Sequence, residues 1–148
     1  MAICDKSAVF WGLPGDLNEW NSICATWDSS TGLSQVWVNG KAGSRKGLGR
    51  GRSLTDPSII LGQEQDAYSG GFNTNDAFTG QVTDVHMWAY VLSPCEIHDF
   101  MNGVSFKPGD IINWQALQYT TSGYVAVENK PNTSINACYN DLSRCSRV

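Results

Sequence analysis

The sequence predicts an all-β fold, a sandwich or jelly roll that carries one short helix. The first observation is compositional: only 16% of the residues are charged, and the 148 residues include 15 glycines and six tryptophans. This composition suits strands and turns better than amphipathic helices. The second is that short runs of apolar alternation recur along the chain, each bounded by Gly, Pro, Asn or Asp. Strands at such spacing are typical of sandwiches and jelly rolls.

The clearest strands are residues 23–27 and 34–38, both of which alternate between apolar and polar residues. The second run meets Asn39-Gly40, a dipeptide that supplies the two positive φ angles of a type I′ turn, so a hairpin is predicted there. Further strands are predicted at residues 8–11, 58–61, 80–88 and 123–127.

One short helix is predicted near residues 94–102. Ser93 is placed to cap it, Pro94 suits the first helical position, and Glu96 completes a Ser-x-x-Glu capping box. Gly103 is expected to end it.

Length and charge indicate one domain that is not a general nucleic-acid binder. A chain of 148 residues can bury a core of its own, and the formal charge of −4 is mild. Residues 1–130 are expected to form the domain, and residues 131–148 a polar C-terminal extension. No run approaches the roughly 18 apolar residues of a membrane span, and the N-terminus carries no apolar region of a secretory signal.

Although the N-terminus shows no secretory signal, the five cysteines and a glycosylation sequon at Asn132 indicate an oxidising compartment. An odd count leaves one thiol without an internal partner, and Cys138 and Cys145 are candidates for a small disulfide within the tail. Because the two signals conflict, we expect the chain to be a fragment or a short isoform.

A polar loop follows the apolar run 58–61 and holds the candidate metal ligands. Glu64 and Asp66 lie one residue apart, so both carboxylates can face one ion. Calcium takes six to eight oxygen ligands, and the next residues supply more oxygen donors in Asn73 and Asp76. An ordinary solvated acidic loop is the alternative, and composition alone slightly favours it.

A glycine-interleaved basic run is a candidate polyanion site. It contains Arg45, Lys46, Arg50 and Arg52. A solvated loop is the stronger alternative, because the run holds no aromatic residue that could stack on bases.

Several motifs resemble those of the pentraxin family, in particular the short pentraxins of the C-reactive-protein and serum-amyloid-P type. Residues 24–29, Cys-Ala-Thr-Trp-Asp-Ser, look like the family signature, and residues 59–66, Ile-Ile-Leu-Gly-Gln-Glu-Gln-Asp, look like its calcium loop. The resemblance extends from residue 8 to about residue 130.

The resemblance implies a lectin-like, concanavalin-like jelly-roll sandwich, here without its N-terminal strands, and a site for two calcium ions. Glu64 and Asp66 would bridge the ions, the backbone carbonyl of Gln65 would ligate one, and Asn73 and Asp76 would complete the ligands. The family carries Glu and Gln at the last two places. It also takes an Asp-Asn pair from an upstream strand that this chain lacks, so we predict weak calcium binding.

The implied function is that of a calcium-dependent, non-enzymatic pattern-recognition lectin of innate immunity, an acute-phase type of protein that is secreted as a homopentamer. Its ligands would be phosphocholine-like, phosphate-bearing or polysaccharide groups on microbes or damaged cells, with complement components as possible partners. The acid that faces choline in the family aligns with Ala8, which puts choline selectivity in doubt. The missing strands are expected to impair binding and to leave the chain poorly soluble.

The resemblance also bears on Cys24, whose family partner is an upstream cysteine. Cys4 is a candidate substitute, and a buried free thiol is the equal alternative.

Two other functions remain open from the sequence. One is a laminin-G-like adhesion module, which shares the sandwich and the use of calcium. The less favoured one is a jelly-roll glycosidase that uses Glu64 and Asp66, although a further Glu expected after them is missing.

Overall fold

The computed structural model describes residues 1–55 and 57–128 and divides the chain into two units, Met1–Leu117 and Gln118–Val148. Within the described residues, all helices and strands belong to the first unit. None of the helices found there has the length and apolar character needed to cross a membrane.

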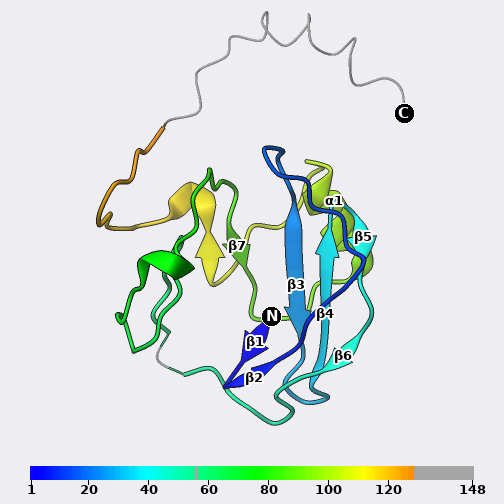
Figure 1. The fold of residues 1–148 in the computed structure, drawn as a ribbon. Coiled ribbons are helices and arrows are strands. Elements are labelled where there is room, and N and C mark those ends of the chain that lie inside the picture. Colours follow the sequence, from blue (N-terminus) through cyan, green and yellow to red (C-terminus); the bar gives the residue numbers. More distant parts are fainter. Residues whose placement is uncertain (56, 129–148) are drawn as a thin grey trace, which may run out of the picture. The chain divides into compact units, whose positions relative to one another are not determined.

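A small four-stranded antiparallel sheet lies beside helix α1 (Pro94–Met101) in the first unit (Figure 1). Its two longest strands are β3 (Ile23–Trp27) and β4 (Leu33–Val38), paired so that Cys24 lies opposite Trp37. Two short strands, β5 (Lys41–Ala42) and β6 (Lys46–Gly47), pair with opposite ends of β4. Both predicted central strands are confirmed, the second beginning one residue earlier than expected.

The turn between β4 and β5 has the predicted conformation. Asn39 has a φ of 50° and Gly40 a φ of 80°, the two positive angles of a type I′ turn. The Asn39 side chain also accepts a hydrogen bond from the Ser22 N–H at 2.8 Å, which ties the turn to the start of β3.

The remaining regular elements are short. A two-stranded pair at the N-terminal end and another near the helix each contain two residues per strand, and two single-turn 3₁₀ helices complete the first unit. They are β1 (Ala2–Ile3), β2 (Lys6–Ser7), β7 (His86–Met87), β8 (Ile112–Asn113), η1 (Thr74–Asp76) and η2 (Trp114–Ala116).

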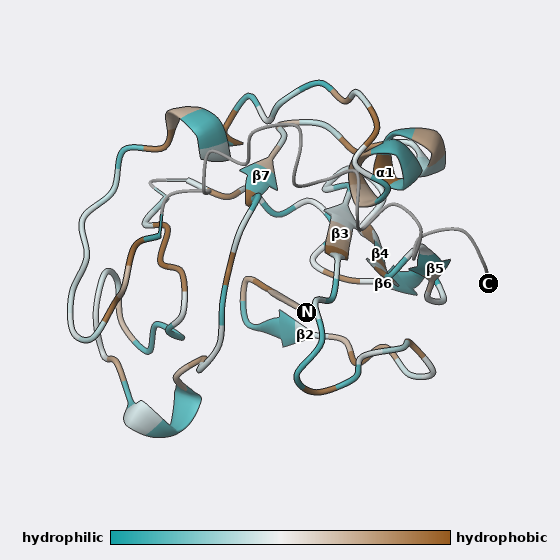
Figure 2. Ribbon diagram, turned by 90° about the horizontal axis from the view of Figure 1, so that it is seen from above, coloured by the Kyte–Doolittle hydropathy of each residue, from teal (hydrophilic) through white to brown (hydrophobic). Residues whose placement is uncertain are grey.

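Helix α1 (Pro94–Met101) forms where the capping signals predict it. The Ser93 side chain accepts from the Glu96 N–H, and the Glu96 carboxylate accepts from the Ser93 N–H at 2.8 Å. Gly103 follows with a φ of 64°, the left-handed conformation that ends many helices. Figure 2 shows both hydrophilic and hydrophobic residues on α1, in keeping with an amphipathic element.

The core lies where α1 packs on one face of the sheet. Cys24 and Trp37 contribute from the sheet, and Leu92 and Ile97 from the helix region, with Ile97 only 1% exposed. Three half-buried side chains, Trp88, Phe100 and Met101, pack against this cluster.

The N-terminal segment contacts the opposite face. Lys46 lies directly across from Ser34. Ser34 is three residues before Trp37 on β4, so the two side chains point to opposite faces of the sheet and Ser34 points away from α1. The Lys46 ammonium donates to the Val9 carbonyl and lies 5.5 Å from the centre of the Phe10 ring. The N-terminal segment thus covers the part of this face around Lys46, whereas Ile23 and Ala25 of β3 stay exposed.

Four predicted strands are wrong or too long. Residues 8–11, 58–61 and 123–127 are irregular, and only His86–Met87 of residues 80–88 is a strand. The reason is pairing, because a strand requires a hydrogen-bonded neighbouring strand. Among the described residues of these runs, only His86–Met87 pair with a neighbouring strand, β8, and Ala8 bonds to Met1 through its backbone. An alternating sequence does not by itself supply a neighbouring strand.

Candidate metal centre

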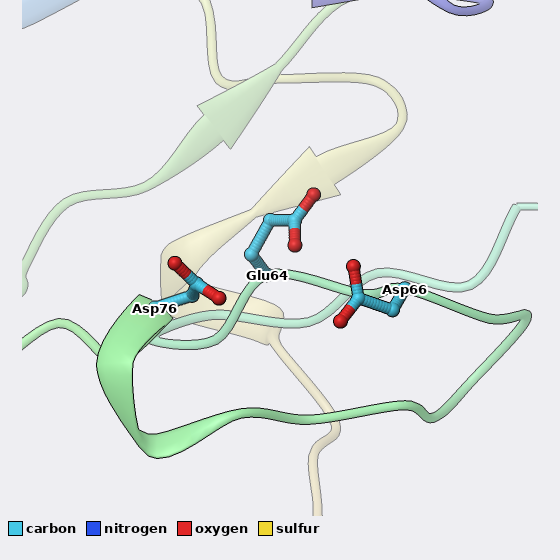
Figure 3. A group of neighbouring side chains, drawn as sticks. All are labelled: Glu64, Asp66 and Asp76. Atoms are coloured by element: carbon cyan, nitrogen blue, oxygen red, sulfur yellow. The ribbon is translucent and has the colours of Figure 1, made fainter.

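Three carboxylates meet at the predicted calcium loop. Glu64, Asp66 and Asp76 each place an oxygen such that all three oxygens lie within 4.8 Å of one another. Glu64 and Asp66 come from the loop after residue 63, whereas Asp76 ends η1 (Figure 3). In this view Glu64 lies between the two aspartates.

Backbone pairing brings the two parts of the loop together. Gln63 and Ala77 form an isolated antiparallel bridge, and the Phe78 N–H donates to the Gly62 carbonyl at 2.9 Å. Because Glu64 and Asp76 directly adjoin this bridge, their side chains emerge close together.

Glycine is required where the loop turns back on itself. Gly71 has a φ of 73°, and a Cβ at this position would lie 2.8 Å from both the Ala67 nitrogen and the Asp66 Cβ. Neither the backbone angle nor the space admits a larger residue without strain. The close approach of residues 66–71 therefore helps to fix the position of Asp66.

Two polar side chains order the loop from within. The Gln65 amide donates to the Ser58 carbonyl at 3.0 Å and accepts from the Ser69 N–H at 3.0 Å. The Asn73 side chain caps η1 by accepting from the Asn75 N–H at 3.0 Å. Both side chains thus support the loop conformation that positions the carboxylates.

The carboxylate group has an uncompensated negative charge. All three side chains are exposed, and none has a hydrogen bond or an ion pair with any residue of the described ranges 1–55 and 57–128. Two unit charges at this separation repel by roughly 1 kcal/mol even in water. A divalent cation would replace this repulsion by attraction, and an all-oxygen set without His or Cys fits calcium better than zinc.

Of the five predicted ligands, the structure gathers three carboxylates and uses the other two side chains for loop order. Sequence reasoning missed Gln63, whose Oε1 is buried without a hydrogen-bond donor in the described part of the chain. Its place beside Glu64 in the Gly-Gln-Glu-Gln-Asp run was the available signal.

Three of the four predicted polyanion residues have hydrogen-bond partners within the fold. Arg45 donates to the Gln35 side chain at 3.3 Å, Arg50 donates to the Ser30 carbonyl at 3.2 Å, and Lys46 holds the N-terminal segment. The proposed role of these residues and of Arg52 in polyanion binding stays a prediction.

Cys4, Cys24 and Cys95 are free thiols, so the disulfide considered between Cys4 and Cys24 is not formed in the structure. Burial raises the pKa of the Cys24 thiol to about 11. The tail cysteines Cys138 and Cys145 and the sequon at Asn132 lie outside the described residues.

Comparison with known proteins gives a consistent result. A family model described as "Pentaxin family" matches residues 1–131. Serum amyloid P-component of Sus scrofa is 47% identical over 107 residues, which cover 72% of this chain and 48% of that protein. C-reactive protein of Sus scrofa is 48% identical over 116 residues, with 78% and 52% covered. The chain therefore spans about half the length of these curated relatives.

The fold is similar to that of a native heptameric SAP-like pentraxin from Limulus polyphemus. The TM-score is 0.68 at 22% sequence identity, and the match covers 73% of this chain and 51% of that one. The predicted fold class, an all-β lectin-like sandwich with one short helix, is confirmed.

Proposed function

The chain belongs to the pentaxin family, and from that membership we propose that it is a calcium-dependent recognition protein of innate immunity. The observation that carries the calcium part is the meeting of the Glu64, Asp66 and Asp76 carboxylates within 4.8 Å. Membership of the family does not by itself show that this loop keeps enough oxygen ligands, suitably placed, to bind calcium.

The proposed site holds calcium through these three carboxylates, with the Gln65 backbone carbonyl and the Asn73 amide oxygen as further donors. Calcium prefers six to eight oxygens, so positions remain for water and for oxygens of a ligand. The bound ion supplies the positive charge that attracts a phosphate or orients sugar hydroxyls. The hydrogen bonds of Gln65 and Asn73 keep the loop in the shape that presents the carboxylates.

The proposed ligands are phosphate-bearing or polysaccharide groups on microbial or damaged-cell surfaces. A preference for phosphocholine is not supported at Ala8, because an alanine offers no charge to balance a quaternary ammonium. Phosphate recognition needs only the metal ions and is unaffected by this residue.

The same proposal includes secretion, contact with complement components and, for a chain of the relatives' full length, assembly into a cyclic oligomer. It also includes a non-enzymatic role. Glu64, Asp66 and Asp76 are all exposed, whereas a glycosidase acid needs an enclosed site that keeps it protonated. A laminin-G-like adhesion role has no specific support beyond the shared use of calcium.

Calcium titration followed by isothermal calorimetry tests the site. With few protein donors on an exposed loop, we expect a Kd of about 10⁻⁴–10⁻³ M, the range of weak extracellular calcium modules. Glu64→Gln and Asp66→Asn should each weaken binding at least about tenfold, because each removes a charge from the cage. The matched control is Asp16→Asn, an exposed acid outside the loop, which should leave the Kd unchanged.

Four results would contradict the proposal. Submicromolar binding would show a more complete cage than three carboxylates and two neutral donors provide. If Asp16→Asn weakened calcium binding as much as Glu64→Gln does, the affinity would depend only on the net charge of the protein. Binding to phosphate-bearing beads that survives calcium chelation would overturn the calcium-dependent recognition step, and hydrolysis of laminarin abolished by Glu64→Gln would support the glycosidase instead.

A further inference from the structure

A pocket lies beside α1 and shares no residue with the carboxylate loop. Its volume is about 120 Å³. It is bounded by the segment that follows β7, by α1 and by the segment before β8. Its lining is Trp88, Tyr90, Leu92, Glu96, Asp99, Ser105, Phe106 and Lys107.

The aromatic walls of this pocket are held in place by the core. The Trp88 indole donates to the Lys107 carbonyl at 3.0 Å and meets the Phe100 ring edge-to-face at 5.9 Å. Phe106 packs edge-to-face against the same Phe100 ring at 4.9 Å. Two of the three aromatic walls are therefore fixed, whereas Tyr90 is 40% exposed at the mouth.

The charges around the pocket favour a cation. Glu96 and Asp99 are the two acids of the lining, and Lys107 is its one base. The Glu96 carboxylate is oriented by the hydrogen bond that it accepts from the Ser93 N–H. Aromatic faces carry negative potential, so rings and carboxylates attract the same kind of group.

Lys107 shows that an ammonium group is accommodated here. Its Nζ lies 5.5 Å from the centre of the Tyr90 ring, and its charge interacts favourably with Glu96. The side chain reaches this place from an exposed loop position and can leave it at little cost. An external ammonium group could therefore compete with Lys107 for this place.

We propose that this pocket binds an alkylammonium group, which displaces Lys107 from Tyr90 and lies between the aromatic walls and the carboxylates of Glu96 and Asp99. The group can come from a free amine or from a lysine side chain of a second protein. The site works without calcium, so it stands or falls independently of the proposed metal centre.

The test is a titration of the whole chain with n-butylammonium chloride, followed by two-dimensional amide NMR at constant ionic strength and with calcium chelated. We expect saturable shifts centred on Tyr90 and Lys107 and much weaker binding of n-butanol, its uncharged counterpart. Titrations with N-acetyl-lysine amide and N-acetyl-norleucine amide then show whether a lysine side chain binds as well as the free amine.

Variants separate the pocket from general surface effects. Tyr90→Leu should weaken n-butylammonium binding about fivefold, the size of one cation–π contact, and Tyr124→Leu is its exposed control. Lys107→Ala should strengthen binding by about two- to fivefold because it removes the competitor, whereas Lys6→Ala should change nothing. Asp99→Asn should weaken binding without touching the helix cap.

The proposal is overturned if n-butanol binds as tightly as n-butylammonium, if shifts do not involve the pocket, or if Tyr90→Leu and Tyr124→Leu behave alike. Weaker binding in Lys107→Ala would also overturn it, since Lys107 would then be a ligand contact and not a competitor. Unchanged amide spectra of the variants outside the pocket establish that each of them is folded.

Discussion

Cys24 illustrates how position decides the chemistry of a residue. Its side chain is buried with Trp37 and Ile97 in the core, and this burial raises the pKa of its thiol from 9.0 to about 11. Cys95, in contrast, is exposed in the first turn of α1. Cys24 therefore packs as a small apolar side chain, and its thiolate is disfavoured in the folded protein.

The pH dependence of stability should reveal this burial. In the unfolded chain Cys24 ionises above pH 9, but in the folded chain it resists ionisation until about pH 11, so the free energy of unfolding falls as pH rises through this window. Allowing for partial solvent contact, we expect a loss of up to about 1 kcal/mol by pH 10.

Urea denaturation at pH 8, 9 and 10 measures this loss. Cys24→Ala should abolish the part of the alkaline decrease that comes from this thiol, although it lowers stability at every pH by leaving a small cavity. Cys95→Ala is the matched control and should retain the decrease. The interpretation fails if the two variants show the same pH profile.

At the scale of single residues, the sequence predicted the carboxylates better than their surroundings. Glu64, Asp66 and Asp76 were identifiable because oxygen donors in a short polar run suggest calcium and because the run resembles a known loop. The place of Gln63 beside Glu64 was a signal for the residue, but the burial of its side-chain oxygen could not be predicted, since burial of one atom depends on packing from residues distant in sequence.

At the scale of elements, local signals succeeded and nonlocal ones failed. The helix and the type I′ turn follow from residues within four positions of each other, namely the Ser93–Glu96 box and Asn39-Gly40. Residues 58–61 and 123–127 alternate as strands do, but alternation cannot specify a pairing partner.

Removing the cap should cost measurable stability. Ser93→Ala leaves the Glu96 N–H without its side-chain acceptor, and caps of this kind are worth about 1 kcal/mol. Chemical denaturation of Ser93→Ala should therefore show a lower free energy of unfolding, whereas Ser53→Ala, at an exposed serine outside any helix, should match the parent chain. A loss of equal size in Ser53→Ala would exclude the cap as its cause.

The β7–β8 pair depends on a close backbone approach at Gly109. A Cβ there would clash with the Ile112 carbonyl and with the Met87 backbone. The Gly109 N–H also donates to His86 Nδ1 at 3.3 Å. This glycine allows the loop before β8 to lie against both strands.

Gly109→Ala should therefore be strongly destabilising, by about 2 kcal/mol or more, because backbone and not a flexible side chain must move. Gly15→Ala is the matched control, since a Cβ at Gly15 meets nothing within 4 Å and its φ is not left-handed. Thermal unfolding followed by circular dichroism compares the two. A melting temperature for Gly109→Ala equal to that of Gly15→Ala would contradict the described approach.

At the scale of the whole molecule, the main feature is the open edge of β3, whose backbone N–H and C=O groups have no neighbouring strand to bond with among the described residues. Among the described residues β3 pairs with β4 alone, so its other edge has no strand partner. Ile23 on this strand is 65% exposed, and Trp20 just before it is 64% exposed. An unpaired edge bordered by exposed apolar side chains promotes edge-to-edge association.

We therefore expect the isolated chain to self-associate through β3, with a mean mass that rises steadily with concentration, in contrast to the single discrete mass of a closed ring. Ile23→Lys should reduce this association, because a charge on an edge strand resists pairing with a second edge. Ile59→Lys, at a 49% exposed isoleucine outside any strand, is the control for a general gain of charge. Sedimentation velocity across a hundredfold range of concentration measures the effect. If Ile59→Lys reduces association as much as Ile23→Lys, scattered apolar exposure and not the β3 edge drives it.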